Sequence, residues 1–110
     1  MDKCKDHFHG INIKLTKCSG ITPLLRMIER ARDLGLSVMI GCMNESTVGS
    51  AAVAHLLPFI DYVDMDGPLL LTRRTLATGI QYDYGKIMYS DAPGLGISLY
   101  RFVSEVSVVL

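Results

Sequence analysis

The chain has 110 residues and no net charge, because 11 basic residues balance 11 acidic ones, and 49% of its residues are hydrophobic. This length allows one small domain or part of a larger one, and the composition excludes a disordered or low-complexity chain. No basic excess is present to neutralise phosphates, and no apolar run reaches the ~18 residues that cross a bilayer. We therefore expect neither a nucleic-acid nor a membrane partner.

The amino-terminal residues and the cysteines favour a cytoplasmic protein. Residues 1–9 are polar and mixed in charge, unlike a secretory signal. Cys4, Cys18 and Cys42 are odd in number and lack C-x-x-C spacing, so we expect free thiols in a reducing compartment. The two histidines that follow Cys4 are not expected to form a zinc site with it, because no second cluster completes four ligands.

The first forty residues predict a strand, a helix and a second strand. Residues 11–16 alternate between an apolar face and a polar face that carries Asn12, Lys14 and Thr16. Apolar residues then recur at helical spacing from 24 to 34, with Thr22 as the expected N-cap, a proline in the first turn and a closing glycine. Residues 36–40 form the second expected strand.

The next segment repeats this order. Ser46 or Thr47 is expected to open a helix over residues 48–57 that Pro58 ends, and residues 62–66 alternate as a third strand. Strand–helix–strand–helix–strand order predicts a parallel α/β sheet with right-handed crossovers. A doubly wound sheet and a TIM-type barrel both fit. Polar residues near the carboxyl ends of the strands favour the barrel, and no G-x-G-x-x-G follows the first strand.

Beyond Pro68 the pattern changes to short strands. Residues 79–84 and 86–89 predict a hairpin that turns at Tyr84-Gly85. A loop over residues 92–96 and an apolar tail over 97–110 follow.

Lys14 is the first candidate for chemistry. If the sheet is a barrel, Lys14 lies on the inward face of a strand near its carboxyl end, between apolar neighbours. Burial disfavours an ammonium group, which is how a lysine becomes a general base near neutral pH. The alternative is a lysine whose amine reaches solvent at the strand end. Lys17, in the following turn, is expected to be a solvated surface residue.

Asp64 and Asp66 are the second candidate. Their i, i+2 spacing directs both carboxylates to one face of the third strand. Two like charges on an inward face need a cation beside them: a metal ion, a lysine or a substrate ammonium. The alternative is a solvated pair at the strand end, where aspartate favours turns. Asp61, before the strand, is expected to be a turn or cap residue.

The loop over residues 41–46 is the third candidate. Glu45 and Ser46 are explained by capping of the following helix. Cys42 is expected to be a small buried thiol, because no partner base is indicated for it. Arg73 and Arg74 are expected on a solvated face.

Four segments together resemble the C-terminal part of enolase-superfamily dipeptide epimerases of the L-Ala-D/L-Glu epimerase type, in the muconate-lactonizing subgroup. They are G-I-N-I-K-L-T-K-C-S-G (10–20), G-C-M-N-E-S (41–46), D-M-D-G-P-L-L-L (64–71) and P-G-L-G-I (93–97). The N-I-K-x-x-K pattern marks the superfamily, and D-x-D before G-P-L is more particular to dipeptide epimerases. Residue 19 departs from the family, since Ser19 stands where its turn usually has a glycine.

The resemblance implies an isomerase that transfers a proton at the carbon α to the carboxylate of a dipeptide, assisted by Mg²⁺. It implies that Lys14 is one of two facing acid/base lysines, on the sixth strand of the barrel. Asp64 and Asp66, on the eighth strand, match the pair that holds the substrate's ammonium, and Cys42 and Met43 match pocket-lining positions. The opposing lysine, the three acidic Mg²⁺ ligands and the N-terminal capping portion would lie before residue 1.

We therefore expect a fragment that is inactive in isolation: the last three barrel strands plus a return into the capping domain. The expected divisions are a lead-in over 1–9, the barrel segment over 10–78, a capping-region hairpin and loop over 79–97, and an unmatched tail over 98–110. Its partners would be the dipeptide, the missing part of the barrel and further copies of itself. The alternatives are a fragment of an o-succinylbenzoate synthase or muconate cycloisomerase, which would not need the Asp64/Asp66 pair, and a non-catalytic self-associating β-α module.

Overall fold

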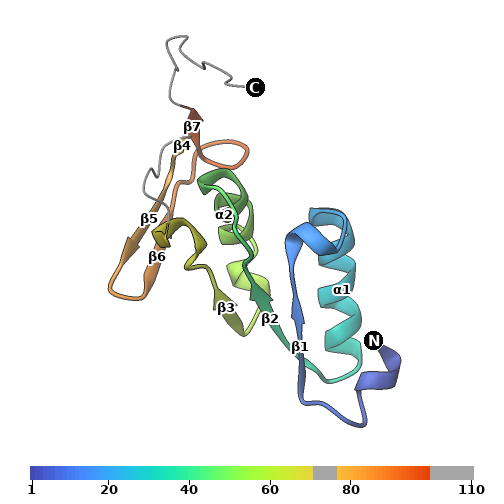
Figure 1. Ribbon diagram of the computed structural model, residues 1–110. Coiled ribbons are helices and arrows are strands. Elements are labelled where there is room, and N and C mark those ends of the chain that lie inside the picture. Colours follow the sequence, from blue (N-terminus) through green and yellow to red (C-terminus); the bar gives the residue numbers. More distant parts are fainter. Residues whose placement is uncertain (71–76, 100–110) are drawn as a thin grey trace, which may run out of the picture.

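A computed structural model describes residues 1–70 and 77–99 (Figure 1). Its centre is a parallel sheet in the order β1-β2-β3, formed by β1 (Gly10–Ile13), β2 (Ser37–Gly41) and β3 (Tyr62–Asp64). Helix α1 (Ile21–Asp33) connects the first two strands and α2 (Thr47–Ala54) connects the second to the third. The predicted strand–helix order and parallel α/β sheet are confirmed.

Two strands are shorter than the alternation predicts. The first strand ends at Ile13 rather than residue 16, because the chain turns after Lys14 into a 3-10 helix (Leu15–Lys17) whose Lys17 N–H donates to the Lys14 carbonyl at 2.9 Å. The third strand ends at Asp64 rather than residue 66, and a 3-10 helix (Gly67–Leu70) follows. In both strands, the alternating sequence pattern extends beyond the last residue that pairs with β2. The second strand is shifted by one residue, to 37–41.

The helix boundaries also differ from the prediction. Helix α1 begins at Ile21 with Gly20 as its N-cap, so Thr22 is not the cap. A proline at the third helical position is tolerated because its missing N–H would have had no partner in the first turn. Ser46, one of the two residues predicted to open α2, is its N-cap, but the helix ends at Ala54, and Pro58 lies within a separate 3-10 helix (Leu57–Phe59).

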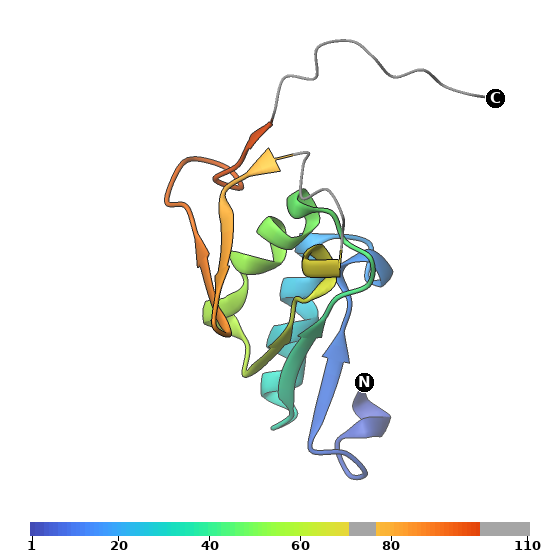
Figure 2. The same cartoon turned by 60° about the vertical axis from the view of Figure 1, so that its left-hand side comes forward.

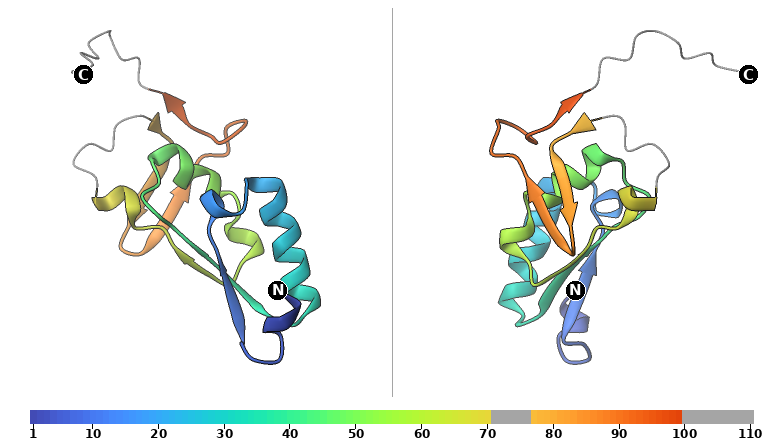
Figure 3. Two further views of the ribbon diagram at one scale, coloured as in Figure 1. Left: turned by 45° about the vertical axis from the view of Figure 1, so that its right-hand side comes forward. Right: turned by 90° about the vertical axis from the view of Figure 1, so that its left-hand side faces the viewer.

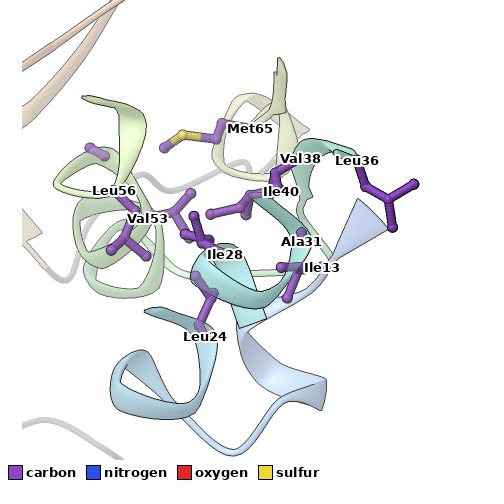
Figure 4. Close-up of a cluster of buried hydrophobic side chains, with 11 residues drawn as sticks. Ile13, Leu24, Ile28, Ala31, Leu36, Val38, Ile40, Val53, Leu56 and Met65 are labelled. Atoms are coloured by element: carbon purple, nitrogen blue, oxygen red, sulfur yellow. The ribbon is translucent and has the colours of Figure 1, made fainter. Parts of the chain in front are cut away.

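The hydrophobic core lies between one face of the sheet and the two helices (Figure 4). Ile13, Val38 and Ile40 project from the sheet and are at most 2% exposed. Helix α1 covers them with the apolar stripe that its sequence predicts, and α2 contributes smaller side chains. The core members are Ile13, Leu24, Ile28, Ala31, Leu36, Val38, Ile40, Val53, Ala54, Leu56 and Met65.

The C-terminal part adds a β-ribbon beside α2, on the side away from α1 (Figures 1 and 2). Strands β5 (Ile80–Asp83) and β6 (Lys86–Tyr89) form the predicted hairpin. Tyr84 and Gly85 both have positive φ, at 42° and 80°, as a two-residue type I′ turn requires. A further antiparallel pair joins β4 (Ala77–Thr78) to β7 (Ser98–Leu99), which the sequence did not predict. A short 3-10 helix (Asp2–Cys4) lies near the amino terminus.

Among residues 1–70 and 77–99, the two outer strands of the sheet, β1 and β3, each pair on one side only, and no helix covers the second face of the sheet (Figure 3). Asn12 and Tyr62 are exposed on that face and Met39 is half-buried. In residues 1–70 and 77–99 no helix has the length and apolar character needed to cross a membrane. Arg73, Arg74 and residues 100–110 of the tail lie outside the described residues.

Candidate active site at the carboxyl ends of the strands

Lys14 immediately follows β1 and reaches across to the end of β2. Its half-buried side chain donates from Nζ to the Cys42 carbonyl oxygen at 2.7 Å. The lysine is still in extended backbone conformation, with φ −120° and ψ 123°, so the residue after Ile13 points away from the helix-covered face. Lys17, in contrast, is exposed, as predicted.

Asp64 and Asp66 converge on the thiol of Cys42. The Sγ atom lies 3.2 Å from Asp66 Oδ1 and 3.8 Å from Asp64 Oδ1. The Cys42 N–H also donates to the Asp64 carbonyl at 2.9 Å, which ties the loop after β2 to the end of β3. Both carboxylates therefore lie on one side, as the i, i+2 spacing predicts, although Asp66 is beyond the strand.

A thiol occupies the position beside the two carboxylates where their like charges predict a cation. Within the described residues neither carboxylate forms an ion pair with a lysine or arginine. Cys42 is half-buried rather than fully buried, which corrects the predicted small buried thiol. Burial raises the pKa of Cys42, and the hydrogen bond to Asp66 and the negative charges of both carboxylates raise it further. The thiol is therefore held in its protonated, hydrogen-donating form.

Glu45 does not cap α2, which corrects its predicted role. Ser46 Oγ is the capping group and accepts from the Gly49 N–H at 3.4 Å. The Glu45 side chain turns back and accepts from the Met43 N–H through Oε2. Its residue exposure is 6%, and its second oxygen is buried with no hydrogen-bond partner in the described part of the chain. Met43 is exposed, and its backbone rather than its side chain takes part in these contacts.

The acidic pair and the lysine line two different cavities. Asp64 and Asp66 border a cavity of about 460 Å³ between β3 and the β5–β6 hairpin. Lys14 borders another of about 340 Å³, together with Asn12, Lys17 and Cys18. Cys42 lies between the two groups, with its carbonyl on the lysine and its thiol on the carboxylates. We call Lys14, Cys42, Asp64 and Asp66 the carboxyl-end cluster.

This cluster does not fit a magnesium ion. Within the described ranges, Cys42, Asp64 and Asp66 are the one group of three side chains whose ligand atoms, all within 4.8 Å of one another, could hold a metal. Mg²⁺ requires octahedral oxygen ligands, and a thiol is a ligand for softer metals. We therefore derive no step of chemistry through Mg²⁺ at these residues.

Sequence reasoning found Lys14, Cys42, Asp64 and Asp66, and the structure brings these four together. It missed the contact of Glu45 with Met43. The available signal was position: Glu45 precedes the N-cap serine, whereas a capping-box glutamate follows its cap by three residues. Asp61 was expected at a turn or cap; its carboxylate accepts from the Val38 N–H at 2.7 Å.

A parallel α/β unit with a lysine and acidic groups at the carboxyl ends of its strands is typical of (β/α)-barrel enzymes, whose chemistry lies at that end. A family model described as "Enolase C-terminal domain-like" matches residues 5–103. The chain belongs to that family. The match extends past residue 97, the last residue of the P-G-L-G-I segment.

Relatives and solved structures agree on this membership. The chain is 58% identical over 97 residues to an L-Ala-D/L-amino acid epimerase of Flavobacterium johnsoniae. That match covers 88% of this chain and 29% of the relative. The chain thus spans under a third of the length of the epimerase it resembles.

Two solved structures superpose well. A dipeptide epimerase from Cytophaga hutchinsonii, complexed with Mg and the dipeptide D-Ala-L-Val, matches with a TM-score of 0.78 and 31% identity, covering 86% of this chain and 27% of that one. An N-succinyl Arg/Lys racemase from Bacillus cereus matches with a TM-score of 0.81 and 32% identity, covering 89% and 27%. The fold is therefore shared with enzymes of both kinds.

Proposed function

We propose that this chain contributes one acid/base and the ammonium-binding pair to a dipeptide epimerase site. The observation that carries the proposal is the convergence of Lys14 and the Asp64/Asp66 pair on one residue, Cys42, at 2.7 Å for the lysine and 3.2 Å for Asp66. A dipeptide has both groups that such a cluster would serve: a primary ammonium, and a carbon α to a carboxylate. The high identity to an epimerase supports the same reading.

In the proposed mechanism, Lys14 exchanges a proton with the α-carbon of the residue that bears the carboxylate. As an ammonium it donates a proton to one face of the carbanion, and as an amine it removes one from that face in the reverse direction. The Cys42 carbonyl orients Nζ between these events. Asp64 and Asp66 hold the substrate ammonium through charge-assisted hydrogen bonds, which would replace the thiol as their partner.

The remaining parts of the site would come from outside the chain. The resemblance implies an opposing lysine and acidic Mg²⁺ ligands on strands that precede β1, where Mg²⁺ would stabilise the enediolate when bound. We propose that residues 10–78 complete such a barrel and that residues 79–97 return to a capping domain. The chain alone is then expected to have no epimerase turnover and to bind Mg²⁺ weakly.

A chimera tests this proposal. The matching C-terminal segment of the Flavobacterium johnsoniae epimerase is replaced with this chain, and L-Ala-L-Glu is incubated with the chimera in D₂O. NMR would follow loss of the glutamyl α-proton signal and appearance of the epimer. Lys14→Met should reduce turnover by about 10²–10⁴-fold, as expected for loss of a general acid/base, whereas Lys17→Met should not. A folded chimera without turnover would contradict the proposal.

The second candidate function is racemisation of an N-acylated amino acid, favoured by the likeness to the N-succinyl Arg/Lys racemase fold. Acylation leaves such a substrate without a free α-ammonium, so the acidic pair would not be needed to hold one. In the chimera, Asp66→Asn should raise KM for L-Ala-L-Glu with a smaller effect on kcat, because it removes binding rather than the acid/base. An unchanged KM would favour the second function. An o-succinylbenzoate synthase or muconate cycloisomerase would likewise be insensitive to the Asp66→Asn substitution.

We further propose that the chain is cytoplasmic and associates with itself in isolation. Self-association is supported by the edges of β1 and β3, which are unpaired within the described residues, and by the open sheet face on which Tyr62 is 64% exposed. Sedimentation velocity should detect oligomers that increase with concentration. A monomer at all concentrations would contradict this part of the proposal.

A further inference from the structure

Glu45 is a buried acidic residue that the proposed chemistry does not use. Its carboxylate accepts a hydrogen bond from the Met43 N–H, and the residue is only 6% exposed. The aliphatic part of its side chain is closely packed, since a Cβ on Gly49 would lie 3.2 Å from Glu45 Cβ and Cγ. Within the described residues a single backbone N–H donates to this carboxylate, and burying a carboxylate with so few donors is unfavourable.

The Met43 N–H belongs to the same peptide group as the Cys42 carbonyl. That carbonyl is the acceptor for Lys14 Nζ at 2.7 Å. A peptide group is planar, and in the trans form its C=O and N–H point in opposite directions. Lys14 and Glu45 therefore hold the two ends of one rigid unit, with the ammonium on the oxygen and the carboxylate on the N–H.

We propose that Glu45 is a positioning residue that orients Lys14 through the Cys42–Met43 peptide. A carboxylate on the N–H polarises the peptide and makes its carbonyl a stronger acceptor, because hydrogen bonds in a chain reinforce one another. It also prevents the peptide plane from rotating, which would turn the carbonyl away from the lysine. This inference rests on the proposed function in one respect: Lys14 is the acid/base that Glu45 orients.

We call this coupling of Glu45 to Lys14 through the Cys42–Met43 peptide the peptide relay. It can be tested in the 110-residue chain without an activity assay. The amide proton of Met43 is observed by ¹H–¹⁵N NMR. Glu45→Gln keeps an oxygen acceptor but removes the charge, so the Met43 amide should move upfield. Lys14→Met should also move it upfield, although Lys14 does not contact that N–H. Glu29→Gln and Lys17→Met are matched controls on exposed residues and should leave it unchanged.

The variants are compared at constant fold, judged from the Val38 and Ile40 amides of β2. A measurement on the unmodified chain adds a further criterion: the Met43 amide should exchange with solvent more slowly than the Asn44 amide, which makes no hydrogen bond within the described ranges. An unmoved Met43 resonance in either test variant, or equal exchange at the two amides, would overturn the relay. None of these outcomes depends on turnover, so failure of the relay is distinguishable from failure of the epimerase proposal.

Discussion

Gly67 lies directly against the Met43 carbonyl: a Cβ on Gly67 would be 2.8 Å from that oxygen and 3.6 Å from Cys42 Sγ. The first residue after Asp66 therefore sets how closely the end of β3 approaches the loop that follows β2. The convergence of the carboxyl-end cluster depends on this approach. The D-x-D-G-P-L motif therefore has a glycine at this position because a side chain would collide with the Met43 carbonyl.

Gly67→Ala tests this contact. The obstructing atom is backbone and cannot rotate away, so we expect destabilisation of about 1–3 kcal/mol, the usual range for overpacking. Gly41→Ala is the comparison: there the added methyl would lie 2.9 Å from the amide tip of the exposed Asn12 side chain, which can move. Urea unfolding of both variants should give the larger loss for Gly67→Ala. Equal losses would show that the close approach is not specific to the Met43 carbonyl.

Leu24 and Leu25 are adjacent on α1 and differ in burial, at 0% and 36% exposure. Leu24→Ala should reduce the free energy of unfolding by about 2–5 kcal/mol, because it leaves a cavity between α1 and the sheet. Leu25→Ala changes helix propensity in nearly the same way but removes little buried surface, so we expect a clearly smaller loss. Thermal and urea unfolding measure both, and a reversed order would contradict the assigned core.

Asp61 should make the chain sensitive to acid. Its hydrogen bond with Arg32, at 2.6 Å, and that with the Val38 N–H lower the pKa of the carboxyl below its ordinary value. A lowered folded-state pKa stabilises the fold fully above the unfolded pKa of about 3.9, and the contribution is lost as pH falls through the folded value. Asp61→Asn should therefore flatten the dependence of Tm on pH below about pH 4. Asp91→Asn, at an exposed aspartate, should keep the wild-type slope.

Cys42 should react slowly with alkylating reagents at pH 8. Its raised pKa leaves less thiolate, which is the reactive form. Asp66→Asn replaces the nearer carboxylate with a neutral amide and so removes a negative charge beside the thiol, and the rate of iodoacetamide modification at Cys42 should increase. Peptide mass spectrometry also gives the rate at Cys18, whose thiol donates to the Leu15 and Gly20 carbonyls and is an internal control. A parallel increase at Cys18 would indicate general loosening rather than loss of the Asp66 contact.

The strands, the helices and their order could be predicted from the sequence because they depend on local patterns of apolar residues and on turn residues. Alternation identified β1, helical spacing identified the buried stripe of α1, and Tyr84-Gly85 identified the hairpin turn. The side on which Asp64 and Asp66 lie also follows from spacing, since a strand has a period of two. The family resemblance added the expected barrel and the roles proposed for Lys14 and the acidic pair.

Tertiary structure alone decided where the strands stop and what the cluster's groups contact. β1 ends at Ile13, which pairs with Ile40, because the chain turns into a 3-10 helix after Lys14, whereas the alternating pattern continues to residue 16. No local signal could reveal that the Cys42 thiol lies between two carboxylates, or that Glu45 and Lys14 hold opposite ends of one peptide group. Those contacts join residues from different strands and loops, and only the packing of the sheet brings them within hydrogen-bonding distance.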